Sequence, residues 1–228
     1  IIASDTALFL SMYPDFNISK IIATPFLPLK NSGDSVILRD QNNYTVFNFY
    51  YSDSLPWIRA ADGTGRTMEL QETEVDNFTL PQSWITSCMY GTPGNPHVSC
   101  NEPLVISEIN YNPSGTSGEW FELYNTSNET INIGGYKIKD HKENNVFILP
   151  NDIAIEPGNY FVIAADTLLF SSIHEPIKNV TGNFTYNLSD NNEVIRVYTP
   201  NDSIVYSVWY DDTNGWPTEA DGNGKTLE

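Results

Sequence analysis

The sequence has few positive charges, few cysteines and no long apolar run. Its 228 residues hold 11 Lys and Arg against 29 Asp and Glu, which gives a formal net charge of −18 at pH 7. Such a surface repels phosphate backbones, and the basic residues do not cluster, so we expect no nucleic-acid binding. The longest apolar stretch, FVIAADTLLF (161–170), is interrupted by Asp166 and is shorter than the roughly 20 residues of a membrane helix. We therefore expect no membrane insertion.

Residues for catalysis or zinc binding are also scarce. The chain has three histidines and two cysteines, and every histidine falls in a predicted loop. No histidine stands in a pattern with a nucleophile, and none pairs with a cysteine at zinc spacing. Glu108, Glu119 and Glu122 lie in the first two predicted strands, but nothing in the sequence fixes the separation that a glycosidase requires. They indicate an acidic stripe facing a partner, or side chains standing singly in solvent. We expect no enzyme activity.

What the sequence does contain is a repeat. VFNFYYSDSLPWIRAADGTGRTME (46–69) recurs as VYSVWYDDTNGWPTEADGNGKTLE (205–228), and IIASDTALF (1–9) recurs as VIAADTLLF (162–170). The offsets are 159 and 161, so self-similarity predicts two copies of one domain in a window of a longer polypeptide. We expect residues 1–100 to be the C-terminal part of the first copy, with unpaired strand edges and a half-covered apolar face. Residues 101–228 are expected to form the second copy without its last strand or strands.

Short segments with period-2 alternation, separated by Gly, Pro, Asn and Asp turns, predict β-strands. One short helix of one or two turns is expected within 166–176. About eight strands at this spacing favour an all-β fold, an immunoglobulin-like antiparallel β-sandwich, present as a tandem repeat. The predicted strands of the second copy are 104–111, 119–125, 131–140, 145–150, 159–165, 184–189, 193–199 and 203–210.

Three motifs in succession resemble the lamin tail domain in its secreted bacterial form. They are LVISEINYNPSG (104–115), GEWFELYNTSNETINIGGYKIKD (118–140) and FILPNDIAIEPGNYFVIAAD (147–166). The stretch ELQETEVDNFTLPQSWITSCMYGTPGNP (69–96) resembles the end of that domain. The resemblance implies an immunoglobulin-like sandwich without catalytic machinery, in large exported or surface proteins that also carry enzymes or adhesive modules. The fold alone supplies no ligand.

The repeated phrase ADGTGRTME and ADGNGKTLE invites comparison with a phosphate loop. That loop needs a glycine where this chain has Glu219, so we expect a glycine turn with positive φ, capped by Asp62 and Asp221. Calcium is the rival ligand, with weak candidates at Asp211, Asp212, Asn214 and Asp221. Against calcium, Lys225 stands at the third ligand place, and most of these carboxylates are missing from the first copy. We therefore expect solvated loops and no cofactor.

Cys88 and Cys100 flank a stretch rich in proline and glycine. Because the family context is exported, where oxidation persists, we expect a disulfide between them rather than two free thiols. The sequence also holds nine Asn-x-Ser/Thr triplets, which would be glycan acceptors in a eukaryotic secretory protein and without meaning in most bacteria. They lie at Asn17, Asn43, Asn77, Asn125, Asn128, Asn179, Asn183, Asn187 and Asn201.

Three functions follow. We expect first an extracellular or cell-surface module that acts as a spacer or adhesion unit of a larger exported protein. Its partners would be other domains of the same polypeptide, surface proteins or glycans. The second is a carbohydrate-binding module that uses Trp57 and Trp216 as ligand-facing aromatics; the alternative is that both rings fold back over the sandwich edge. The third is an accessory domain of an exported enzyme.

Overall fold

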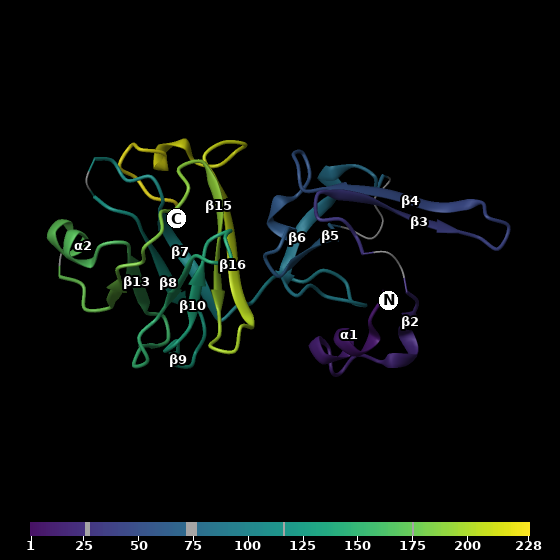
Figure 1. Ribbon diagram of the computed structural model, residues 1–228, viewed down its shortest axis with the longest axis horizontal. Helices are drawn as coiled ribbons and strands as arrows, with labels where there is room; N and C mark the ends of the chain where they lie inside the picture. Colours follow the sequence, from purple (N-terminus) through teal and green to yellow (C-terminus); the bar gives the residue numbers. More distant parts are fainter. Residues whose placement is uncertain (26–27, 72–76, 116, 175) are drawn as a thin grey trace. The chain divides into compact units, whose positions relative to one another are not determined.

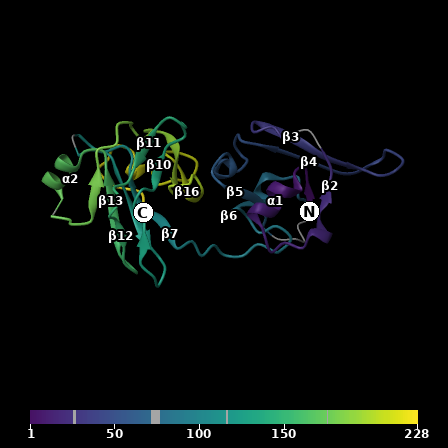
Figure 2. The same ribbon diagram turned by 60° about the horizontal axis from the view of Figure 1, so that its bottom comes forward.

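The computed structural model consists mainly of β-strands and describes residues 1–25, 28–71, 77–115, 117–174 and 176–228 (Figures 1 and 2). It divides into two compact units. Unit 1 comprises residues 1–59, 68–87 and 91–98, and unit 2 comprises residues 60–67, 88–90 and 99–228. No helix among the described residues is long and apolar enough to cross a membrane.

Two four-stranded sheets build unit 2. The first has the order β14-β13-β8-β7 and the second the order β11-β10-β15-β16; Figure 1 shows α2 outside the first sheet. Neighbouring strands are antiparallel except β13 and β14. The bounds are β7 Leu104–Asn110, β8 Trp120–Asn125, β10 Lys137–Lys139, β11 Val146–Ile148, β13 Tyr160–Ala164, α2 Thr167–Ile173, β14 Val180–Gly182, β15 Asn192–Tyr198 and β16 Ile204–Asp211. A further pair joins β9, Ile131–Asn132, to β12, Ala154–Ile155.

The period-2 alternation of the strands places the core of unit 2. In β8, Phe121 and Leu123 are fully buried and belong to the main cluster, together with Ile163 of β13 and Ile195 of β15. Trp120 points the other way and packs with α2 in a small second cluster. Alternation on strands therefore gives the sandwich one apolar core and one face covered by a short helix. The predicted all-β, immunoglobulin-like antiparallel sandwich is confirmed.

Unit 1 contains smaller sheets. In the described part, β1 pairs only with β2, β3 only with β4, and β5 only with β6. Among the residues of unit 1 that the structure describes, the buried hydrophobic ones are Ala3, Phe49 and Trp57. The bounds are β1 Ile2–Ala3, α1 Thr6–Met12, η1 Ile18–Lys20, β2 Ile22–Ala23, β3 Gly33–Arg39, β4 Thr45–Ser52, β5 Arg66–Leu70, η3 Pro81–Ser83 and β6 Trp84–Met89. Residues 66–67 and 88–89 of β5 and β6 belong to unit 2, as do most of η2, Arg59–Ala61, and all of η4, Thr218–Ala220.

The predicted strand at 184–189 is wrong. Phe184 and Leu188 are buried in the core, but this segment has no strand assignment. The backbone N–H of Leu188 donates to the Glu119 carboxylate at 2.8 Å, and the Tyr186 hydroxyl donates to the Ile138 carbonyl at 3.2 Å. Side chains, instead of a neighbouring strand, thus anchor this segment. The predicted short helix is confirmed as α2, with Asp166 capping it by accepting from two backbone N–H groups.

Candidate functional site

The repeated glycine phrase is a structural turn in both places. Gly63, Gly65, Gly222 and Gly224 have φ values of 66°, 82°, 68° and 79°, which L side chains rarely adopt. These positive values confirm the predicted glycine turn. They also explain why both copies of the phrase keep glycine at these two places.

The second of these turns lies against the end of β7. Asn112 donates its side-chain N–H to the Asp221 carboxylate at 2.6 Å, and its carbonyl accepts from the Gly222 N–H at 3.1 Å. Ile109 and Leu227 exchange two backbone hydrogen bonds of 2.9 Å each. Asp221 was expected to cap its own turn, but its carboxylate serves as the link between the turn and the segment after β7.

The loop that holds the weak calcium candidates is stabilised by its own hydrogen bonds. The Asp211 side chain is buried, and its Oδ1 accepts from the Thr213 N–H at 2.8 Å and from the Thr213 hydroxyl at 2.6 Å. The Asn214 side chain donates to that same hydroxyl at 2.7 Å. Asp212 is partly exposed. This pattern is that of an Asx turn, which needs no ion.

A group that the sequence reasoning missed lies elsewhere in unit 2. Among the described residues, three acidic or histidine ligand atoms come within 4.8 Å of one another only at Asp140, His141 and Glu193. Asp140 and Glu193 are buried, and His141 Nδ1 contacts Glu193 Oε1. The two Asp140 oxygens accept from the Lys142 N–H and the Asn145 side chain, at 2.6 and 2.5 Å. These hydrogen bonds hold the turn that follows Asp140. Because Glu193 comes from a distant part of the sequence, the group forms no local motif.

The two tryptophans of the predicted ligand face pack against their own units. Trp57 is 8% exposed, and its ring meets the Phe49 ring edge-on at 5.6 Å between centroids. Trp216 is partly buried against the main cluster of unit 2. For Trp57 this arrangement matches the alternative given above, a ring folded back over its own unit, because Phe49 gives the ring an apolar surface to cover.

Burial raises the pKa of two carboxyls, those of Glu119 just before β8 and of Glu122 within it. Loss of solvation raises the pKa of Glu119 to about 7; the Leu188 N–H lowers it, and the charges of Asp190 and Glu193 raise it further. Burial also raises the pKa of Glu122, although the Ser107 hydroxyl donates to its Oε1 at 2.8 Å. Glu108 and Glu122 face each other across β7 and β8, whereas Glu119 lies just before β8 and accepts from the Leu188 N–H. Two of the three predicted carboxyls are therefore neighbours, and the third is held apart from them.

The Glu119 carboxyl makes stability depend on pH. Its pKa is higher in the folded chain than the usual 4.5, so the folded state binds more protons between pH 4.5 and about 7. This contribution is complete below pH 4.5 and is lost as the pH rises through 7. Because the group is partly solvated, we expect a loss of only about 1 kcal/mol.

Glu119→Gln keeps an acceptor for the Leu188 N–H and removes the titration. Between pH 5 and pH 8, the free energy of urea unfolding should fall by about 1 kcal/mol more in the unmodified protein than in this variant. Glu129→Gln, at an exposed position, is the matched control and should track the unmodified protein. Parallel pH profiles for Glu119→Gln and the unmodified protein would contradict the assignment.

An aromatic pair lies on the outer face of the first sheet. The rings of Tyr124 and Tyr160 stack at 4.5 Å between centroids, and Tyr160 is 48% exposed. A shallow pocket of about 340 Å³ beside Tyr160 is lined also by Glu122, Asn159 and Lys178. This arrangement puts an aromatic ring next to both charged and amide groups.

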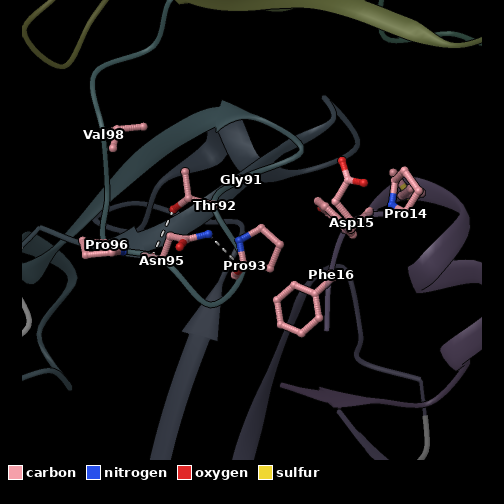
Figure 3. A pocket seen from close by; sticks show the side chains of 11 residues that line it. Pro14, Asp15, Phe16, Gly91, Thr92, Pro93, Asn95, Pro96 and Val98 are labelled. Carbon is pink, nitrogen blue, oxygen red and sulfur yellow. Dashed lines mark hydrogen bonds between the residues drawn. The ribbon is translucent and has the colours of Figure 1, made fainter. Parts of the chain in front are cut away.

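A larger pocket of about 590 Å³ lies in unit 1, between the turn after α1 and the segment 91–98 (Figure 3). Figure 3 shows Phe16 beside Pro93. Glu69 fixes one wall, because its Oε1 accepts from the Thr92 N–H and hydroxyl, at 2.7 Å each, and its Oε2 lies 2.9 Å from His97 Nδ1. The pocket is chiefly apolar, and sequence reasoning missed it because its walls come from opposite ends of the sequence of unit 1.

The expected disulfide is present. Cys88, in β6, and Cys100, just before β7, are bonded and have Cα atoms 5.2 Å apart. The bond closes a loop with a sequence separation of 12 residues. It therefore ties the end of β6 to the entrance of the sandwich of unit 2.

Comparison with known proteins identifies the sandwich. The lamin tail domain model matches residues 97–210, which is half of the 228-residue chain and takes in the strands from β7 to most of β16. A search of the curated proteins found no match. The two-sheet architecture and the matched sequence agree, and the chain belongs to the lamin tail domain family.

Proposed function

We propose that this chain acts as a non-catalytic spacer or interaction unit of a larger exported protein in which the lamin tail domain is repeated. The observation that carries the proposal is the recurrence of whole elements. Strands β3 and β4 recur with identical lengths as β15 and β16, and α1 recurs with identical length as α2, each at the offset of the matching sequence repeat. On this proposal, residues 1–100 are the C-terminal part of one domain and residues 101–228 a second one. Repeated units extend reach, and linked weak sites gain avidity.

An extracellular or cell-surface location fits two further features. The disulfide between Cys88 and Cys100 would persist in an oxidising compartment. Eight of the nine Asn-x-Ser/Thr asparagines are exposed; Asn125 is fully buried. The eight exposed positions would accept glycans only if the protein passes through a glycosylating secretory route.

A spacer should behave as separate mechanical units, and single-molecule extension of the full chain tests this. Unit 2 should unfold in one step that lengthens the chain by roughly 400 Å, the contour length released by residues 104–227. The disulfide lies outside that stretch, so reduction should leave this step unchanged. Gradual extension without such a step would contradict the spacer role.

Carbohydrate binding is the second candidate function, and the stacked tyrosines favour it. Sugars bind to exposed aromatic faces flanked by hydrogen-bonding groups, and Tyr160 offers such a face beside Glu122 and Asn159. Affinity electrophoresis in gels containing polysaccharides should show retardation that Tyr160→Ala abolishes. Tyr50→Ala, at a similarly exposed tyrosine of unit 1, is the control. Equal mobility in every gel would reject this function and leave the spacer role.

A further inference from the structure

The hairpins β3–β4 and β15–β16 share one internal design. Leu38 faces Phe47 and Val36 faces Phe49 in unit 1, and at the corresponding places Val197 faces Tyr206 and Ile195 faces Val208 in unit 2. Residues facing each other across antiparallel strands lie on the same side of the sheet. The two hairpins therefore present equivalent apolar faces.

The equivalent faces differ sharply in exposure. Ile195 and Val197 are 1% and 0% exposed, whereas Val36 and Leu38 are 39% and 52% exposed. The same contrast holds one element earlier, where Ile163 of β13 is fully buried and its counterpart Ile2 of β1 is 56% exposed. The β3 side of this face is thus open in unit 1, whereas Phe49 on β4 is 6% exposed and packs against Trp57 and Trp84. Exposed apolar side chains that lie together mark an interaction surface.

Three strands pair at the corresponding edges in unit 2. Strand β10 pairs with β15, and β8 pairs with β13. Strand β7 reaches the C-terminal segment through Ile109 and Leu227. In the described part of unit 1, the strands β3, β1 and β5, which correspond to β15, β13 and the segment around Leu227, each pair with one neighbour only. The open edges and the open face occur at the same equivalent places.

We propose that the face of β3–β4 bearing Val36 and Leu38 is an acceptor surface for a strand segment with the pattern of residues 104–161. This segment docks as β7, β8 and β10 do in unit 2. In unit 2 this segment continues directly from residue 161 into the rest of β13, and β1 corresponds to the end of β13. The inference rests on the proposed repeat and adds the occupant and its register.

A fusion protein tests the proposal. A second copy of residues 101–161 is placed directly before Ile1 of the full chain, so that the added segment continues into β1 in the register of β13. Amide hydrogen exchange of β3 and β4 should slow at least ten-fold relative to the unextended chain, and binding of the dye ANS should fall. Exchange in β15 and β16 should stay unchanged and reports that unit 2 is intact.

Two controls keep the test sharp. Leu38→Asp in the fusion should return the exchange of β3 and β4 to the rate of the unextended chain. Phe121→Ser and Leu123→Ser, made only in the added segment, should do the same. Unchanged exchange in the unmodified fusion overturns the proposal, whether the added segment stays disordered or aggregates. If the unextended chain forms a dimer in which β3 and β4 exchange as slowly as in the fusion, the proposal is also overturned, because the occupant would then be a second copy.

A negative result here is distinguishable from failure of the spacer role. The extension step of unit 2 depends on residues 104–227 of the original chain and does not require the added segment. Loss of that step would reject the mechanical role, whereas an unchanged step with an unprotected β3–β4 would reject only the acceptor surface.

Discussion

Replacing Ile195 with alanine should lower the free energy of unfolding of unit 2 by about 2–5 kcal/mol. The side chain is 1% exposed and lies on β15, between β10 and β16, where it joins the main cluster. Truncation removes apolar contacts and leaves a cavity that close-packed neighbours fill only in part. Urea unfolding, monitored by hydrogen exchange in peptides from β15, measures the loss of unfolding free energy.

Val36 provides the matched control because it occupies the equivalent place in β3. It is 39% exposed, so Val36→Ala should cost less than about 0.5 kcal/mol when exchange is followed in β3. The contrast between two equivalent positions isolates the effect of the covering strands. Comparable costs at both positions would show that Val36 is packed in solution and would contradict the open face.

Much of the fold could be predicted because the alternation of apolar and polar residues that marks a strand is local in the sequence. Period-2 alternation located β7, β8, β13, β15 and β16, since one face of each strand meets the core. The repeated phrase marked glycine turns because only a few residues tolerate positive φ. The segment 184–189 misled because it also supplies buried side chains, yet its Leu188 N–H donates to the Glu119 carboxylate instead of to a neighbouring strand.

Candidate sites were harder to predict because they depend on contacts between distant residues. Trp57 has a polar, loop-like context in sequence, and its burial depends on Phe49 in a preceding strand. The perturbed pKa of Glu119 depends on a segment that comes much later in the sequence. Asp211 could be placed in a turn, but the choice between an ion and Thr213 as its partner required coordinates.

Asn125 illustrates the same limit and carries the second large effect. In sequence it is one of several glycosylation triplets, but its side chain is fully buried. Its side-chain nitrogen donates to the Glu129 and Ile155 carbonyls at 2.7 and 2.8 Å, and its Oδ1 accepts from the Ser127 N–H and hydroxyl at 2.9 and 2.7 Å. One amide thus joins the end of β8 to the loop that follows it and to β12.

Asn125→Ala should therefore lower the free energy of unfolding of unit 2 by roughly 3 kcal/mol, because it leaves buried carbonyl and N–H groups without partners. Asn125→Asp should cost at least as much, since a carboxylate oxygen would face the two carbonyls that now accept from the amide. Asn128→Ala, at the exposed triplet three residues later, should change stability by less than about 0.5 kcal/mol. Urea midpoints of the three variants decide the matter. If Asn125→Asp has the same urea midpoint as the unmodified protein, the Asn125 amide does not hold the loop after β8 and β12 together.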